Sequence, residues 1–233
     1  MHTAEAGQAQ PRRGRRKPGG AGASRQRVID AAITCILEQG LYRASSNAIA
    51  EQAGLSWGVI QYYFGNRESL MLAVLEEGAR RLEVAVRDTE ISGGTLRERV
   101  SGYMDILAAY YGSPYYLVFT QVLISLSHDP KTTEKTRRTL RGLAAETQPP
   151  LRSLQEQVLG DARPRHPEVQ SLLFHSLRGL ALSHVMLGAV PSNDLSEVSR
   201  EFPEQRALLA EAISLLIEQE TGDGEADAAG RSA

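Results

Sequence analysis

The sequence predicts an all-α protein with a small N-terminal helical domain and a larger helical domain after it. Apolar residues recur at helical spacing, no segment shows the alternation of a half-buried strand, and glycine or proline clusters separate the segments. The chain has 233 residues, of which 42% are hydrophobic and 23% are charged. This is the composition of a soluble globular protein that is long enough to bury a core.

The two ends of the chain differ from the rest in composition. Residues 1–23 and 222–233 are rich in glycine and alanine and nearly lack large apolar side chains, so we expect both to be disordered. The first end is basic and the last is acidic, although the net charge of the whole chain is only −2. Between them we expect one domain over residues 24–85 and a second over residues 86–221.

The first helix is expected to begin after Ser24 and to end at Gly40. Its apolar face includes Val28 and Ala32, and the single cysteine, Cys35, lies in line with them. One cysteine excludes a disulfide within the chain. We therefore interpret this thiol as part of the core, with a redox sensor as the alternative.

Two short helices joined by a tight turn follow. The first is expected to start at a cap formed by Ser45 or Ser46 and to end at Gly54, and the second to run from a cap at Ser56 to Gly65. Short helices that cross through a glycine-containing turn form a helix-turn-helix, whose second helix fits the major groove of DNA. A helical hairpin within an ordinary α-domain is the alternative.

The outward face of the second short helix has the chemistry of a DNA contact. The residues expected on this face are Trp57, Gly58, Gln61 and Tyr62. Glutamine pairs bidentately with adenine, tyrosine hydroxyls reach phosphates, and a glycine lets the backbone approach closely. This face therefore favours DNA binding over a buried aromatic surface.

A spaced pattern runs through the same region and includes Ser45, Ile49, Ala50, Ala53, Gly54, Leu55, Ser56, Gly58, Phe64 and Arg67. With the helix before it and the helix after it, this pattern resembles the DNA-binding domain of the TetR family of bacterial transcriptional regulators. The chain departs from the family at Gln61, where tyrosine is usual, and at Tyr63, where histidine is common. The operator sequence of another family member therefore cannot be assigned to this chain.

The outward chemistry and the resemblance together give a set of predicted DNA-binding residues. These are Ser45, Ser46, Ser56, Trp57, Gly58, Gln61, Tyr62, Tyr63 and Arg67. The basic end adds Arg12, Arg13, Arg15 and Arg16, because arginines on a flexible leader can enter a narrow minor groove. The alternative for this end is a solubilising tail or a misplaced start codon.

A fourth helix is expected from Arg67 to the Ser92-Gly93-Gly94 break, with its start near DNA and its far end in the second domain. After it the sequence predicts five helical segments, over residues 96–111, 114–126, 131–159, 168–187 and 203–220. The consecutive prolines Pro149 and Pro150 lie inside the third of these segments. We therefore expect a kink or break near Thr147.

Aromatic residues concentrate at the start of the second domain, where the resemblance implies a variable ligand-binding and dimerisation domain. The predicted ligand pocket consists of Tyr103, Met104, Leu107, Tyr111, Tyr115, Phe119, Leu123 and Phe174. Its tyrosine hydroxyls would orient a mostly hydrophobic molecule. The alternative is that these side chains fill the core or lie at the surface.

The last two helices carry more apolar residues than one core face requires, which predicts half of a four-helix interface completed by a second subunit. The predicted dimer residues are Leu173, Leu177, Leu180, Leu208, Ile213 and Leu216. Small Gly179 would permit close approach of the helices.

An enzyme is the weaker interpretation. His175 and His184 are nine residues apart on one helix and point to roughly opposite faces, so they cannot share a metal ion. Neither a nucleophile elbow nor a catalytic carboxylate pair stands out, so no catalytic residue, metal or cofactor is expected. A helical adaptor that binds only protein would leave the basic end and the Gln61/Tyr62 face unexplained.

The sequence therefore predicts a homodimeric regulator that binds a palindromic double-stranded DNA operator and responds to a small hydrophobic effector. The predicted role is that of a repressor released by its ligand, with an activator or dual regulator as the alternative. The chain has neither an apolar run long enough to span a membrane nor the apolar centre of a signal peptide, so we expect a cytoplasmic protein.

Overall fold

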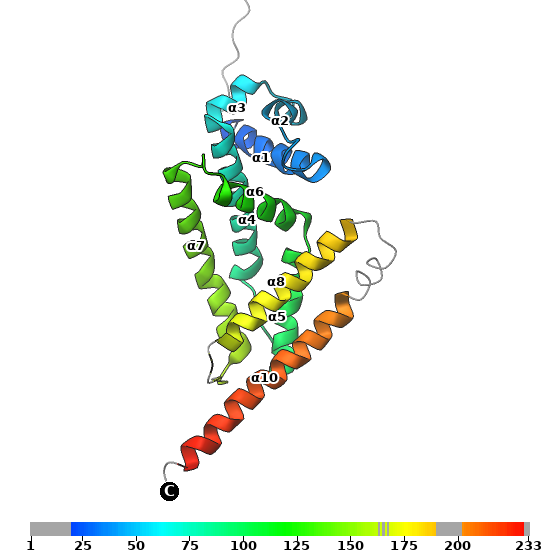
Figure 1. Cartoon of the computed structure of the whole chain (residues 1–233), viewed down its shortest axis with the longest axis vertical. Helices are drawn as coiled ribbons and strands as arrows, with labels where there is room; N and C mark the ends of the chain where they lie inside the picture. The colour runs from blue at the N-terminus through cyan, green and yellow to red at the C-terminus, as the bar shows by residue number, and fades with distance from the viewer. Residues whose placement is uncertain (1–19, 163, 165, 167, 190–201, 231–233) are drawn as a thin grey trace, which may run out of the picture.

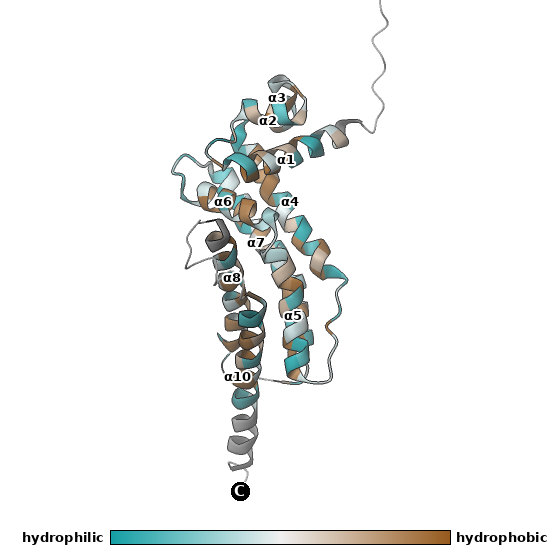
Figure 2. Cartoon of the chain, turned by 90° about the vertical axis from the view of Figure 1, so that its right-hand side faces the viewer, coloured by the Kyte–Doolittle hydropathy of each residue, from teal (hydrophilic) through white to brown (hydrophobic). Residues whose placement is uncertain are grey.

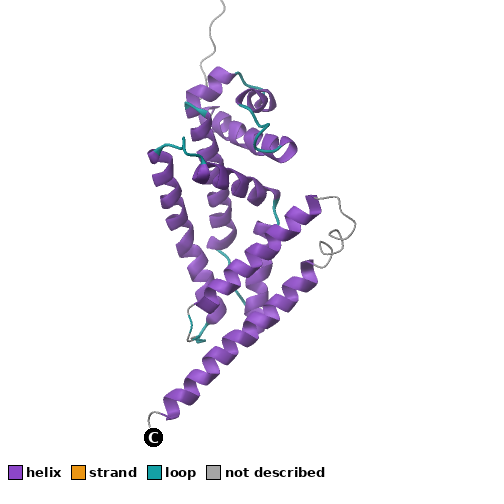
Figure 3. Ribbon diagram, in the orientation of Figure 1, coloured by secondary structure: helices purple, strands orange, loops and turns teal. Residues whose placement is uncertain are grey.

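The computed structural model describes residues 20–162, 164, 166, 168–189 and 202–230, and the regular elements in these ranges are all α-helices (Figure 3). This arrangement confirms the all-α prediction. In chain order the helices are α1 (Gly20–Gln39), α2 (Ser46–Ala53), α3 (Trp57–Phe64), α4 (Arg67–Arg87), α5 (Leu96–Tyr111), α6 (Pro114–His128), α7 (Glu134–Leu159), α8 (Glu168–Ala189) and α10 (Phe202–Gly230).

The four arginines of the predicted basic arm lie outside the described residues. None of the helices in the described ranges has the length and apolar composition that a bilayer crossing requires.

Helices α1, α2 and α3 gather at one end of the molecule, and α4 runs from that end into the remaining helices (Figure 1). Helix α6 crosses α4 directly below the N-terminal group, and α7 runs along the side of α4. At the opposite end α8 and α10 pack against each other and against α5. Helix α4 is thus the element that joins the two ends.

The N-terminal helices share one hydrophobic core, and α6 contributes to it. Buried residues of α1 to α4 make up most of this cluster, and Val118, Val122 and Leu126 of α6 complete it. The sequence places α6 well beyond the expected domain boundary at residue 85. Because three of its apolar residues are buried among the N-terminal helices, a displacement of α6 changes the packing beneath the helix-turn-helix.

The second core lies between α5, α7, α8 and α10. Its largest fully buried side chains include Tyr103, Met104, Leu107, Leu154 and Leu177. Phe119 of α6 packs against both cores. Helix α6 therefore contacts the interior of both parts of the chain.

Local capping chemistry explains where several helices begin. Thr95 and Glu98 form a capping box at the start of α5, in which the Thr95 hydroxyl accepts from Glu98 N at 3.2 Å and Glu98 accepts from Thr95 N at 3.0 Å. The Asn66 side chain accepts from Ser69 N at 2.8 Å at the start of α4. These short-range bonds account for the agreement between expected and observed starts.

Helix α7 continues through Pro149 and Pro150, so of the kink or break expected near Thr147 the break does not occur. Two prolines remove two backbone donors from the helix and leave the carbonyls of Ala145 and Glu146 without their usual partners. Both of these residues are exposed, so water can satisfy the carbonyls at little cost.

Helix α10 is longer than expected and runs to Gly230, through most of the segment that we expected to be a disordered tail. The segment from Glu218 to Ala229 is rich in alanine and glutamate, which have high helix propensity. At the other end of the chain, α1 begins at Gly20, so residues 20–23 of the expected arm are helical.

Candidate nucleic-acid interface

Helices α2 and α3 are held in a helix-turn-helix by their inward side chains. Ile49 is fully buried on α2 and Ile60 is fully buried on α3. Gly54 ends α2 with φ 62° and ψ 34°, a left-handed conformation that glycine adopts without steric cost, and the chain restarts as α3 three residues later. The turn thus fixes the direction of α3 relative to α2.

The outward face of α3 is open to solvent. The Tyr62 side chain is 81% exposed, and Gly58 and Gln61 are also exposed. A methyl group at Gly58 would meet only Ser56 Oγ, at 3.8 Å, so the backbone at Gly58 can be approached closely from outside. The face has the hydrogen-bonding groups and the close-approach position that base and phosphate contacts require.

Trp57 and Tyr63 are less outward than the other predicted residues of α3. Both are partly buried and pack against the N-terminal core, which corrects the expectation that Trp57 faces fully outward. The Tyr62 and Tyr63 rings meet edge to face with their centres 5.3 Å apart. The partly buried Tyr63 ring therefore packs against the exposed Tyr62 ring on its protein side.

The predicted serine residues differ in what their hydroxyls do. Ser45 caps α2 by accepting from Ala48 N at 3.2 Å. Ser56 stands at the N-cap position of α3, but its side chain makes no capping hydrogen bond, contrary to our expectation. Ser56 is exposed and Ser46 is partly exposed, so both hydroxyls lie on the accessible surface beside α3.

Arg67 is turned towards the protein, although it was predicted to contact DNA. Its Nη2 donates to the backbone oxygens of Leu41 at 2.9 Å and Ala44 at 3.1 Å. The side chain is partly buried, and this burial lowers the pKa of its guanidinium. These contacts give Arg67 a structural role in fixing the connection between α1 and α2.

That connection carries two exposed residues that sequence reasoning missed. Tyr42 is 99% exposed and its neighbour Arg43 is also exposed, immediately before the cap of α2. A tyrosine and an arginine just ahead of a helix N-terminus are typical phosphate-binding groups. An aromatic residue between Gly40 and Ser45, where no core pattern requires one, was the available signal.

The predicted ligand-pocket residues differ in exposure. Tyr103, Met104 and Leu107 are fully buried in the second core, and Tyr111 is 2% exposed. The other predicted members, Leu123, Phe119 and Phe174, are partly buried, and Tyr115 is exposed. The first four residues therefore lie in the interior of the second core, and their role in ligand binding stays a prediction.

Two buried tyrosine hydroxyls show how little water enters this core. Burial raises the pKa of Tyr103 to about 12, and its hydroxyl accepts from Gln155 Nε2 at 3.5 Å. The Tyr111 hydroxyl is buried without a hydrogen-bond partner among the described residues, and burial also raises its pKa. The rings of Tyr111 and Phe174 meet edge to face, with centres 6.0 Å apart.

The predicted dimer residues divide into two groups. Leu173, Leu177 and Ile213 are buried within a single chain, so they belong to the core and not to an exposed interface. Leu180 and Leu216 are partly buried, whereas Leu208 is 67% exposed. Of the six predicted dimer residues, Leu208 is the exposed one.

The outer faces of α8 and α10 carry further exposed apolar residues. On α8 these are Leu172, 47% exposed, and Met186, 58% exposed. On α10, Leu215 is 59% exposed and follows Leu208 by seven residues. Figure 2 shows hydrophobic residues along both helices. Within the described part of the chain, no three histidine, cysteine or acidic residues gather in a way that could hold a metal ion.

Comparison with known proteins connects this geometry to a family. Residues 28–74 match the family model of bacterial regulatory proteins of the tetR family. The chain is 33% identical over 78 residues to the HTH-type transcriptional repressor AcnR of Corynebacterium glutamicum, covering 32% of this chain and 42% of that protein. It is 29% identical over 180 residues to the HTH-type transcriptional regulator BetI of Brucella anthropi, covering 75% of this chain and 88% of that protein.

The first curated relatives are matched over 42–44% of their length. A crystal structure of a transcriptional regulator from Rhodococcus sp. Rha1 is similar in fold, with a TM-score of 0.61 and 20% identity over 84% of this chain and 96% of that chain. The family match covers the helix-turn-helix and most of α1 before it, and it extends into α4. Residues 28–74 are therefore similar to the DNA-binding domain of the TetR family of bacterial regulatory proteins. The matched family and the relatives are regulators and not enzymes.

Proposed function

We propose that this regulator is a homodimeric repressor that inserts α3 into the major groove of a palindromic operator. The observation that carries the proposal is the open face of α3, where Tyr62 is 81% exposed and Gln61 and Gly58 are exposed beside it. Gln61 would read a base edge, and Tyr62 would contact a base or a phosphate. Tyr42 and Arg43, in the connection before α2, would add contacts to the DNA backbone.

The exposed apolar residues of α8 and α10 support the dimer. Leu172, Gly179 and Met186 are spaced by seven residues on α8, and Leu208 and Leu215 are spaced by seven on α10. A seven-residue spacing keeps these side chains on one face of each helix, and exposed Gly179 allows a second helix to come close. Pairing two copies through this face would cover apolar surface that is exposed in one chain.

The packing of α4 and α6 supports control by a ligand. Helix α4 begins beside α3 and ends among the helices of the second core, and α6 contributes to the N-terminal core. A molecule that shifts either helix therefore changes the orientation of α3, which alters the fit of two recognition helices to their half-sites. Repression agrees with the name of the relative AcnR, which is called a transcriptional repressor, although an activator would use the same DNA contacts.

Selection of bound DNA from a random pool tests this proposal. The full chain is incubated with random duplexes, and bound molecules are separated, amplified and sequenced over several rounds. The expected result is enrichment of an inverted repeat whose half-sites are about one helical turn or a multiple of it apart. An unenriched pool would contradict the DNA-binding proposal, and a single enriched half-site would contradict the dimer.

A further inference from the structure

A groove of about 440 Å³ opens between α4, α5 and α6. It is lined by Arg81, Ala85, Thr89, Ile106, Ala109, Tyr110, Ser113 and Tyr115. Arg81 and Ala85 of α4, and Thr89 just after its end, follow each other at intervals of four, whereas Leu82 and Val86 are buried in the second core. The groove is therefore lined by a side of α4 that the second core does not cover, and its volume suits a small molecule.

Three of the hydroxyl groups in the lining take part in hydrogen bonds within the protein. Tyr110 Oη donates to Gly78 O at 3.2 Å, and Thr89 Oγ1 donates to Ala85 O at 2.8 Å. Ser113 Oγ accepts from Tyr116 N at 3.3 Å as part of the cap of α6. Because these groups have partners, the groove offers an occupant mainly apolar contacts.

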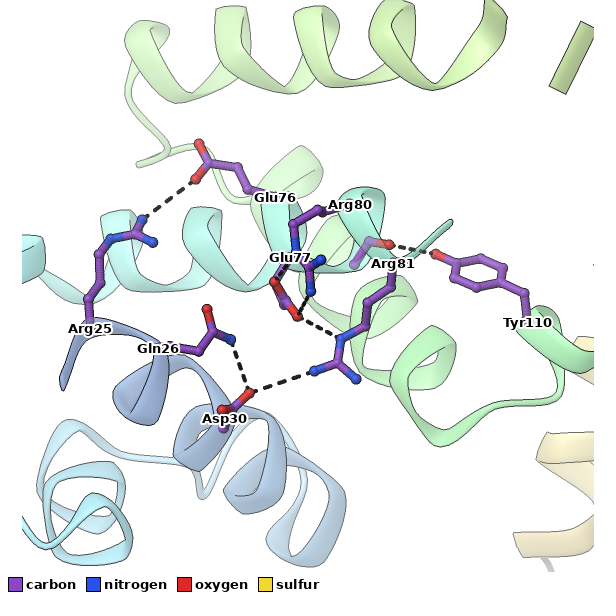
Figure 4. A network of polar contacts seen from close by, with 9 residues as sticks. Arg25, Gln26, Asp30, Glu76, Glu77, Arg80, Arg81 and Tyr110 are labelled. Carbon is purple, nitrogen blue, oxygen red and sulfur yellow. Dashed lines mark hydrogen bonds and ion pairs between the residues drawn. The ribbon is translucent and has the colours of Figure 1, made fainter. Parts of the chain in front are cut away.

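Arg81 lines the groove, and its guanidinium is directed towards Glu77 of α4 and Asp30 of α1 (Figure 4). Its guanidinium carbon lies 3.9 Å from the centre of the Tyr115 ring of α6, a cation–π contact. Its Nε donates to Glu77 Oε1 at 2.8 Å, and its Nη2 is 3.6 Å from Asp30 Oδ1 of α1. Arg81 therefore connects the groove with the first helix of the DNA-binding domain.

The charges around Arg81 are balanced, so the groove does not call for an ion. Glu77 pairs with both Arg80 and Arg81, and Asp30 provides the second carboxylate. Two guanidinium groups thus face two carboxylates. An added anion would leave one negative charge in excess, and an added cation would be repelled by the two arginines.

We propose that the α4–α5–α6 groove binds a neutral, mainly apolar small molecule that packs against Tyr115 and moves Arg81 relative to Asp30. Such a molecule competes with the guanidinium for the ring of Tyr115, so its binding changes the contact between α4 and α1. This inference rests on the proposed function, because it gives the site and the chemical class of the effector. The groove shares Tyr115 with the predicted aromatic pocket, whereas Tyr103, Met104, Leu107 and Tyr111 of that pocket are buried in the second core.

The first test measures binding without DNA. Calorimetry on the full chain uses 2-naphthol as the neutral probe and 2-naphthoate as its charged counterpart. The substitution Ala109→Trp fills the groove, because Ala109 is an exposed lining residue on α5. Ala145→Trp is the matched control, because Ala145 is exposed on α7 outside the groove.

If the α4–α5–α6 groove is the binding site, 2-naphthol should bind the wild-type chain and the Ala145→Trp control with the same affinity. Ala109→Trp should weaken the affinity for 2-naphthol at least about tenfold. The proposed site also predicts weaker binding of 2-naphthoate. Failure of 2-naphthol to bind, or equal binding to both tryptophan variants, would overturn the site. Tighter binding of 2-naphthoate would overturn the chemical class.

The second test measures coupling, with the operator found by DNA selection. 2-Naphthol should lower the operator affinity of the wild-type chain, and Asp30→Asn should reduce this response while leaving 2-naphthol binding unchanged. Asp88→Asn, at the exposed end of α4, is the matched control and should respond like the wild type. Operator affinity that is identical with and without bound 2-naphthol would overturn the coupling. A chain that binds no operator would contradict the proposed function, whereas the calorimetric result would stand.

Discussion

Arg67 shows how one side chain holds the entrance to the helix-turn-helix. The two carbonyl oxygens that it contacts, those of Leu41 and Ala44, are 26 and 23 residues away in sequence. They belong to the connection that presents Tyr42 and Ser45 at the surface. Periodicity and capping patterns describe contacts within one helix turn or two, so a contact of this separation could not be derived from the sequence.

The substitution Arg67→Met should lower the free energy of unfolding by about 1–3 kcal/mol, because it removes the donor from two partly buried carbonyls while keeping the apolar stem. Urea unfolding followed by circular dichroism measures this change. Arg43→Met is the control, because Arg43 is exposed in the same connection and should change stability by less than about 0.5 kcal/mol. Equal effects of the two substitutions would contradict the structural role of Arg67.

Gly78 of α4 lies against Phe119 of α6, with no room for a side chain between them. A Cβ atom at this position would be 2.7 Å from Cδ2 of Phe119 and 3.5 Å from its Cβ. Gly78→Ala should therefore lower the free energy of unfolding by about 1–3 kcal/mol. Gly142→Ala, at an open position within α7, should instead raise it by about 0.5–1 kcal/mol. Thermal unfolding of both variants checks the opposite signs, and stabilisation by both would show that α4 and α6 are not in tight contact.

Among the helices, α4 and α7 are joined near the DNA-binding end by Glu68. Its Oε1 accepts from Thr133 Oγ1 at 2.6 Å and from Thr133 N at 3.2 Å. The hydrogen bond from the Thr133 side chain is the main reason why the pKa of Glu68 is lower than its ordinary value of 4.5. Thr133 also caps α7, so this contact connects the beginnings of two helices.

The lowered pKa of Glu68 gives a defined pH dependence. The contact contributes fully to stability above the ordinary pKa of 4.5, and the contribution is lost as the pH falls through the lower pKa of the folded state. Glu68→Gln removes this titration but keeps an acceptor oxygen. Its urea midpoint should therefore fall less steeply than that of the wild type below pH 4.5. Glu51→Gln, at an exposed position on α2, is the control, and an unchanged slope for Glu68→Gln would argue against the contact.

The helices that sequence reasoning located well are those defined by local chemistry. Leu96–Tyr111 was predicted with its observed bounds, because a capping box precedes it and Gly112 follows it. The continuity of α7 through Pro149 and the burial of Leu126 in the N-terminal core depend on solvent exposure and on distant helices. Neither leaves a signal in the local sequence.

For the candidate sites, too, local sequence patterns predicted exposure within one helix but not packing between helices. The outward placement of Gln61 and Tyr62 followed from helical spacing within α3 and agrees with their exposure. The predicted ligand pocket stays a prediction, because an aromatic-rich sequence does not show whether its rings line a space or fill it. Tyr111 is buried in the second core, and Tyr115, four residues later, is exposed and lines the α4–α5–α6 groove.

At the scale of the whole molecule, the proposed dimer would cover faces of α8 and α10 that a single chain leaves exposed. Leu208→Glu places a charge on the proposed interface, where Leu208 is 67% exposed, and should shift the chain from dimer to monomer at micromolar concentration. Sedimentation equilibrium measures the shift. Val84→Glu is the matched control, because Val84 is 63% exposed on α4 and should leave the dimer intact. A Leu208→Glu protein that remains dimeric would place the interface elsewhere.

The central claim is that the exposed face of α3 reads DNA, and the affinity of the Tyr62→Ala protein for the selected operator tests it most directly. Fluorescence anisotropy compares wild type, Tyr62→Ala and the control Ile124→Ala, in which an exposed residue of α6 is shortened. We predict that Tyr62→Ala weakens binding by about 1–3 kcal/mol, while its unfolding midpoint and the affinity of Ile124→Ala remain at the wild-type level. Wild-type affinity of the folded Tyr62→Ala protein would show that α3 does not contact DNA through this face.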